Sequence, residues 1–143
     1  MRQAAAGLPR RHENQGPTHG ELFDPAGNPL LPDGVPLAGG RVRSGDDPAL
    51  LTGLNLSPRE AASRSLRGHV EAYVAAWMRD RKLPDDVVLV INNRVCPGPL
   101  SCRNLLGSVM KPGHRITVYE TDPDGTLRRQ PRVFTGTGER ITT

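Results

Sequence analysis

The pattern of hydrophobic and polar positions predicts one helix and one strand with particular clarity. Residues 69–82 place hydrophobic side chains at the spacing of a single helix face: Val70, Tyr73, Val74, Trp77 and Met78. Residues 87–91 read Val-Val-Leu-Val-Ile, which is typical of a strand buried on both faces at the centre of a sheet. Because Trp77 lies on the helical stripe, we expect it in the core and not exposed as a stacking surface.

Two further elements are predicted before the amphipathic helix. Short hydrophobic runs on either side of Asp24–Asn28 indicate a hairpin, and the neighbouring prolines should keep its strands short and at a sheet edge. Ser57-Pro58-Arg59-Glu60 is a capping box with proline at the first helical position. The helix that it begins should end near Leu66, before Gly68. Residues 39–53 are expected to form a loop.

Three more elements follow the buried strand. Residues 102–110 predict a short helix that ends at Lys111-Pro112-Gly113. Residues 116–119 and 127–134 predict two strands, joined by the turn 122–125. So short a connection requires an antiparallel pair, because a parallel return needs a dozen residues or more.

The order of these elements predicts the fold class. A hairpin, two helices, a strand, a helix and two strands indicate an α/β layered domain with a mixed central sheet, helices packed against it and a C-terminal antiparallel strand pair. A length of 143 residues fits one domain. Residues 1–17 are polar and lack periodicity, so we expect a disordered tail or linker followed by a single domain over residues 18–143.

Composition and charge narrow the possible partners. No run approaches the ~18 hydrophobic residues that a membrane-spanning helix needs, and residues 1–17 lack the hydrophobic stretch of a secretory signal peptide. We therefore expect no membrane partner. The net charge is +4, and residues 94–143 hold 8 basic and 4 acidic side chains. This basic excess suits a polyanionic partner such as nucleic acid, although for a net charge of +4 alone a solvated surface is the simpler explanation.

The residues that carry chemistry are spread over two segments. His69-Val70-Glu71 lies at the predicted start of the amphipathic helix, and 24 residues separate it from Cys96, with Cys102 beyond. Taken alone, the histidine could be structural, and the cysteines could be buried thiols or form a loop disulfide. Together, and in this order, they are similar to the zinc-deaminase signature. In that chemistry one imidazole and two thiolates leave a zinc position open for water, and a glutamate that does not bind the metal moves protons.

A longer resemblance extends over residues 68–118, with a further match at residues 133–136. The segments that carry this resemblance are Gly68-His69-Val70-Glu71, Trp77-Met78-Arg79, Asn92-Asn93, the two cysteines, Ile116-Thr117-Val118 and Val133-Phe134-Thr135-Gly136. In these segments the chain resembles the DddA-like family of bacterial polymorphic-toxin cytidine deaminases. This resemblance implies the cytidine-deaminase fold and hydrolytic conversion of cytosine to uracil in DNA. It makes His69, Cys96 and Cys102 the ligands of Zn²⁺ and Glu71 the proton shuttle.

The same resemblance has implications for biology. It implies an interbacterial toxin domain with a cognate immunity protein, exported by a dedicated secretion system and active in the cytoplasm of the target cell. We expect the domain to be a monomer. Other readings are the same chemistry on RNA or free cytidine and, in another class, a non-catalytic basic domain that binds nucleic acid or a protein partner.

The chain departs from the DddA-like pattern between its cysteines. The spacing is Cys-x5-Cys, from Cys96 to Cys102, where Cys-x2-Cys is usual, and no aromatic residue lies between them. Leu100 is the one side chain there that could act as a wedge in a duplex. Because single-stranded DNA avoids the unstacking cost, it is at least as good a candidate substrate as duplex DNA.

Four further residues are candidates for contact with the substrate. Asn92 and Asn93 follow the central strand, where they could bind the sugar or base or simply form a turn. Arg94 and Arg103 flank the cysteine loop, so we expect them to contact phosphates.

Overall fold

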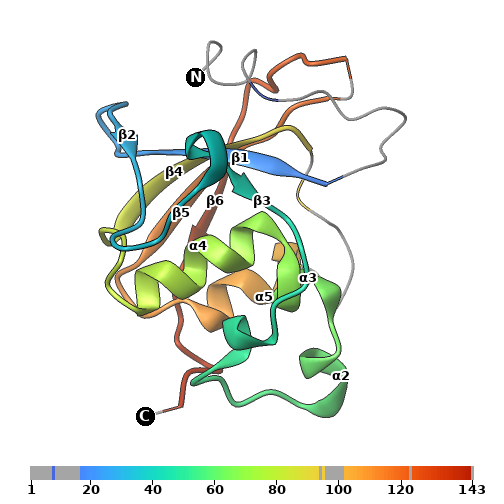
Figure 1. The fold of residues 1–143 in the computed structure, drawn as a ribbon. Coiled ribbons are helices and arrows are strands. Elements are labelled where there is room, and N and C mark those ends of the chain that lie inside the picture. The colour runs from blue at the N-terminus through green and yellow to red at the C-terminus, as the bar shows by residue number, and fades with distance from the viewer. Residues whose placement is uncertain (1–7, 9–16, 94, 96–101, 123, 143) are drawn as a thin grey trace.

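The computed structural model describes residues 8, 17–93, 95, 102–122 and 124–142, and a mixed sheet forms its centre (Figure 1). The strands are β1 (His19–Phe23), β2 (Pro29–Leu30), β3 (Val42–Arg43), β4 (Asp86–Ile91), β5 (Arg115–Tyr119) and β6 (Arg132–Thr135). The α-helices are α2 (Pro58–Ala61), α3 (Arg64–Gly68), α4 (Val70–Arg79) and α5 (Cys102–Leu105). Short 3-10 helices are η2 (Ala38–Gly40), η3 (Pro48–Leu51) and η4 (Leu106–Val109).

The strand order is β2-β1-β4-β5-β6, with β3 pairing to β1. β4 lies in the middle, antiparallel to β1 with Gly20 opposite Ile91, and parallel to β5 with Asp86 opposite Arg115. β5 and β6 are antiparallel. The predicted α/β class, the mixed sheet, the central position of 87–91 and the C-terminal antiparallel pair are therefore confirmed.

Several element boundaries differ from the prediction. The strand expected over 127–134 begins only at Arg132, because Pro131 has no N–H to donate to a ladder; Leu127 instead forms an isolated bridge with Thr121. The stretch 39–53, expected to be a loop, contains β3 and two 3-10 helices. The helix expected over 102–110 is α5 followed by the tighter η4.

The helix expected from Ser57 to Leu66 is broken in two. Its capping box is confirmed: Ser57 Oγ accepts from the Glu60 N–H at 3.2 Å, and Glu60 Oε1 accepts from the Ser57 N–H at 3.0 Å. The backbone leaves the helix at Ser63, which has an extended conformation. The break keeps α2 at the surface and turns α3 so that Leu66 is buried.

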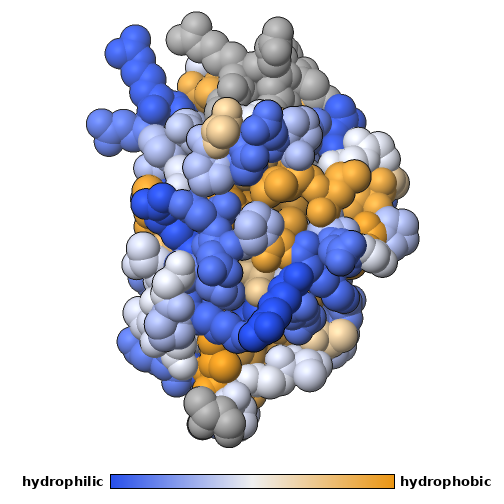
Figure 2. Space-filling view, turned by 90° about the vertical axis from the view of Figure 1, so that its left-hand side faces the viewer, coloured by the Kyte–Doolittle hydropathy of each residue, from blue (hydrophilic) through white to orange (hydrophobic). Residues whose placement is uncertain are grey.

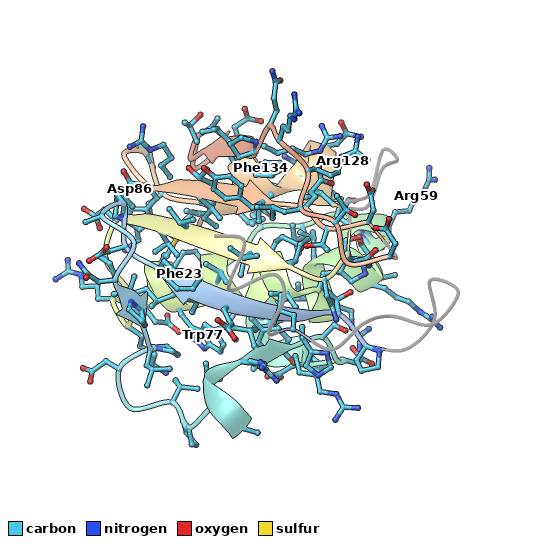
Figure 3. All side chains as sticks on the ribbon, turned by 90° about the horizontal axis from the view of Figure 1, so that it is seen from above. Phe23, Arg59, Trp77, Asp86, Arg128 and Phe134 are labelled. Atoms are coloured by element: carbon cyan, nitrogen blue, oxygen red, sulfur yellow. The ribbon has the colours of Figure 1, made fainter. Side chains whose placement is uncertain are left out.

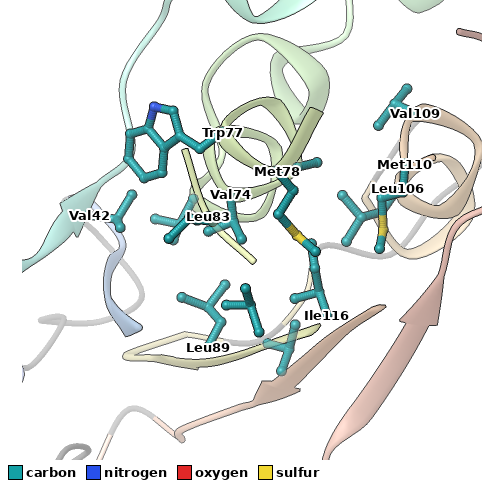
Figure 4. Close-up of a cluster of buried hydrophobic side chains, with 14 of the residues drawn as sticks. Val42, Val74, Trp77, Met78, Leu83, Leu89, Leu106, Val109, Met110 and Ile116 are labelled. Carbon is teal, nitrogen blue, oxygen red and sulfur yellow. The ribbon is translucent and has the colours of Figure 1, made fainter. Parts of the chain in front are cut away.

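One hydrophobic core lies between the sheet and the helices, which gather on one face (Figures 1 and 4). Val74 and Met78 of α4 pack in the same cluster as Leu89 of β4 and Ile116 of β5. Trp77 belongs to this cluster and is 8% exposed, so its predicted place in the core is confirmed. Each such side chain contributes about 1.5–3 kcal/mol by its removal from water.

The opposite face of the sheet carries a smaller cluster. Val90 packs there with Phe23, Tyr119 and Leu127, and Leu8 covers them, itself 5% exposed. The predicted disordered tail otherwise falls on residues outside those described, apart from Pro17. Leu8 therefore fixes one point of the N-terminal segment onto the back of the sheet.

The described surface is mostly hydrophilic. Figure 2 shows hydrophilic side chains over most of one face of the molecule, with a hydrophobic band between them. Among the described residues, Leu31 and Val133 are the large hydrophobic side chains with high exposure. No described helix has the length and apolar character required to cross a bilayer.

Candidate active site

The start of α4 places the histidine and the glutamate of the sequence motif. His69 is the N-cap: its backbone is extended, and its carbonyl accepts from the N–H groups of Ala72 and Tyr73 at 3.0 and 3.2 Å. Glu71 lies in the first turn and is 3% exposed. The helix N-terminus carries partial positive charge from its unpaired N–H groups. A carboxylate such as that of Glu71 is favoured at this end.

A close backbone contact fixes the residue before His69. The carbonyl of Gly68 accepts from the Gly45 N–H at 2.8 Å. A Cβ on Gly68 would lie 1.6 Å from the Gly45 carbonyl oxygen. Glycine is therefore required at position 68, and the segment around Gly45 forms a wall directly beside the start of α4.

A pocket opens next to His69. Its volume is about 420 Å³, and it is lined by Pro17, Ser44, Gly45, Asp46, Arg64 and His69. Ser44 is fixed from both sides, because its Oγ accepts from the Thr18 N–H and its own N–H donates to the Thr18 carbonyl, each at 2.8 Å. Arg64 is exposed and forms no ion pair within the described part of the chain. The half-buried imidazole thus borders a polar space that a small ligand can enter.

The cysteines are placed only through their neighbours. Cys102 is the first residue of α5, and α5 contacts α3 (Figure 1), the helix that ends immediately before His69. Cys96 lies outside the described residues, and no group of three or more His, Cys, Asp or Glu side chains comes together among those described. Histidine and cysteine are the donor types that zinc prefers, so His69, Cys96 and Cys102 fit it chemically.

Asn92 and Asn93, which the sequence predicted as substrate contacts, form hydrogen bonds between the end of β4 and the start of β1. Asn92 is buried, and its Oδ1 accepts from the His19 N–H at 2.8 Å. Asn93 donates from Nδ2 to Thr18 Oγ1 at 3.0 Å. These bonds hold the exit of β4 against the entry of β1, and a substrate contact by either residue stays a prediction. Arg94 and the side chain of Arg103 lie outside the described part of the structure.

Sequence reasoning missed Glu120, which is buried at the carboxyl end of β5. Its Oε2 accepts from the Val95 N–H at 2.6 Å, and its Oε1 accepts from Arg132 Nε at 2.9 Å. It therefore holds the residue directly before Cys96. A signal existed in the sequence, because Glu120 immediately follows a predicted strand and ligand sites gather at the carboxyl ends of parallel strands.

His19, at the entry of β1, was also missed. Its pKa is lowered from the ordinary value of 6.5, chiefly by burial and then by the charges of Arg43 and Arg41. Its Nδ1 is buried and has no hydrogen-bond partner within the described residues. Burial and the two neighbouring arginines thus both disfavour the charged form of this imidazole.

Comparison with known proteins assigns the chain to a family. A family model described as SCP1.201-like deaminase matches residues 1–139. The chain belongs to the SCP1.201-like deaminase family. A search of curated proteins finds no match to it. As a member, the protein is a hydrolytic deaminase with a mixed α/β fold, and the family typically depends on zinc.

Proposed function

We propose that this SCP1.201-like deaminase converts cytosine to uracil in single- or double-stranded DNA with bound zinc, as a DddA-like interbacterial toxin domain. The observation that supports it most directly is the buried Glu71 in the first turn of α4, next to the N-cap His69. Its burial keeps the carboxylate away from bulk water, within one helix turn of the imidazole. A deaminase needs an acid at this place that does not bind the metal.

The chemistry assigns a task to each residue. His69, Cys96 and Cys102 would hold zinc, which when bound would lower the pKa of a water molecule. Glu71 would take a proton from the attacking water, whose oxygen adds to C4 of cytosine, and would deliver that proton to N3 of the ring. The second proton of the water would go to the amino group on C4; the C4–N bond then breaks, ammonia leaves and the C4 carbonyl of uracil forms. The buried position of Glu71 excludes bulk water from this transfer.

The proposed substrate and biology rest on charge and on the DddA-like resemblance. The basic excess over residues 94–143 supports a polyanion, because cationic side chains release counterions from phosphates. The resemblance supports a cognate immunity protein, export by a dedicated secretion system and action in the cytoplasm of a target cell.

Uracil formation is the decisive measurement. Matched single-stranded and duplex oligodeoxynucleotides with one cytosine are incubated with the protein and then cleaved at uracil. Glu71→Gln should lower the rate by about 10²–10⁴-fold with zinc content unchanged. Glu139→Gln is the matched control, since Glu139 is exposed and should keep full activity.

Other substrates are arms of the same experiment. If product forms only from RNA or free cytidine, the protein is still a cytidine deaminase, but its substrate is not DNA. No product with any substrate, from folded protein containing zinc, would overturn the deaminase proposal in favour of a non-catalytic basic binding domain.

A further inference from the structure

A second pocket lies where the chain passes from β5 to β6. Its volume is about 420 Å³, and we call it the arginine pocket after its lining: Glu120, Arg128, Arg129, Gln130, Pro131 and Arg132. Figure 3 shows Arg128 on this segment, next to the end of the sheet. The lining is largely cationic and polar, so the pocket suits an anion better than an apolar ligand.

The three arginines differ in their ion pairs. Arg132 Nε donates to Glu120 at 2.9 Å, and Arg128 Nη1 donates to Asp122 at 3.2 Å. Arg129 is exposed and forms no ion pair within the described residues. A guanidinium has five N–H donors, so one carboxylate contact leaves Arg128 and Arg132 able to bind more. Arg129 contributes a positive charge that no described carboxylate offsets.

Phosphate is the anion that this lining matches. Planar guanidinium groups bind phosphate oxygens through two parallel N–H bonds, with a geometry that lysine cannot offer. The two ion pairs hold Arg128 and Arg132 in place before a ligand arrives, which lowers the entropy cost of binding.

Glu120, which lines the arginine pocket, also contacts the segment that leads to Cys96. Glu120 is 2% exposed and bonds to the Val95 N–H, one residue before the proposed ligand Cys96. β5 also runs parallel to β4, so Glu120 and Asn92 leave the sheet at the same edge. The arginine pocket therefore lies at the end of the sheet where β4 and β5 both finish.

We propose that the arginine pocket binds a backbone phosphate of the DNA strand whose cytosine enters the active site. This inference rests on the proposed function, since it names where the strand is held. Arg129 is the main contact, and Arg128 and Arg132 complete the pocket. Free cytidine has no phosphate and makes no use of it.

Binding is tested in the Glu71→Gln background, which holds substrate without turnover. The affinity for a fluorescein-labelled, cytosine-containing single strand is measured by polarisation over a range of salt concentrations. Arg129→Gln should weaken binding several-fold at low salt and reduce the slope of log K against log salt by about 0.7, the value for one phosphate contact on a single strand.

The matched control is Arg59→Gln. Arg59 is exposed on α2, without an ion pair among the described residues. α2 lies at the lower end of Figure 1, whereas the segment from β5 to β6 lies at the upper end. The control removes the same charge and should leave the salt slope unchanged. Equal losses from the two variants, or none from Arg129→Gln, would overturn the proposal.

Turnover separates this inference from the proposed function. In the active protein, Arg129→Gln should raise KM for the oligonucleotide several-fold and leave kcat and free-cytidine turnover unchanged. An equal loss on free cytidine would contradict a phosphate contact. Absence of turnover on every substrate would sink the deaminase proposal, while the binding and salt-slope comparison would still decide whether the pocket holds a phosphate.

Discussion

The buried carboxylate of Glu120 accepts a 2.6 Å hydrogen bond from the backbone N–H of Val95, a residue 25 positions earlier in the chain. Val95 is itself 1% exposed. Its amide therefore has little access to water, and Glu120 supplies the acceptor that a buried N–H requires. The contact anchors the chain just before Cys96 to the end of β5.

We predict that Glu120→Ala destabilises the protein by about 1–3 kcal/mol, because the Val95 N–H is left without its acceptor. It should also weaken zinc binding by about tenfold, the effect expected when the support of a metal ligand is lost. Urea unfolding and competition with a zinc chelator measure the two effects. Glu120→Gln keeps an acceptor and should recover most of the zinc affinity. Equal zinc affinity in the unaltered protein, Glu120→Ala and Glu120→Gln would contradict the proposal that Glu120 anchors the segment before Cys96.

Gly68→Ala adds only one methyl group, but we expect it to displace the start of α4 and therefore to lower activity strongly. The added methyl meets the Gly45 carbonyl oxygen, so the start of α4 must move, at a cost of about 1–3 kcal/mol. Activity should fall further than stability, because His69 moves with the backbone. Gly45→Ala is the control on the other side of this contact, since its Cβ meets only the Tyr73 hydroxyl at 3.3 Å. Comparable activity in the two variants would count against this view.

Removal of zinc should lower the melting temperature. A ligand that binds only the folded state stabilises it by about 2.7 kcal/mol at a hundredfold excess over its dissociation constant. Dialysis against a chelator followed by addition of zinc should first lower and then restore the melting temperature. His69→Ala should respond to neither treatment. A response of His69→Ala identical to that of the unaltered protein would exclude His69 as a ligand.

Acid should destabilise the protein partly through Glu60. Hydrogen bonding from Arg140, followed by that from the Ser57 N–H, lowers the pKa of Glu60 from 4.5 to about 2. In the unfolded chain this carboxyl takes up a proton near pH 4.5, whereas in the folded protein it does so only near pH 2. Its contribution to stability is therefore complete above pH 4.5 and is lost as the pH falls toward 2. Melting temperatures across this range should fall less steeply for Glu60→Gln than for the unaltered protein.

The elements that the sequence predicted well are those whose pattern is local. The stripe from Val70 to Met78 and the run 87–91 reflect burial along one element, and the Ser57 capping box involves residues three apart. The motif His69-x-Glu71 could be found in the same way, because both residues lie in one helix turn.

The features that escaped prediction depend on contacts between distant segments. Gly68 meets Gly45, and Glu120 holds Val95; neither pairing leaves a periodic signal in the sequence. The same is true of the break at Ser63, which follows from the burial of Leu66. The basic excess of the C-terminal third, which includes the arginines of the arginine pocket, was evident in the sequence. That three of these arginines line one pocket depends on how the chain passes from β5 to β6.

The position of β1 between β2 and β4 has a consequence for the folding of the chain. The hairpin β1–β2 and helix α4 involve contacts close in sequence, whereas pairing Gly20 with Ile91 closes a loop of about 70 residues. Contacts of such long range form slowly. Gly20 also lies under Val70 at the start of α4, so the β1–β4 pairing completes the frame around His69. We therefore expect helix to appear early during refolding and metal-binding competence to appear late, in the same kinetic step as the central sheet.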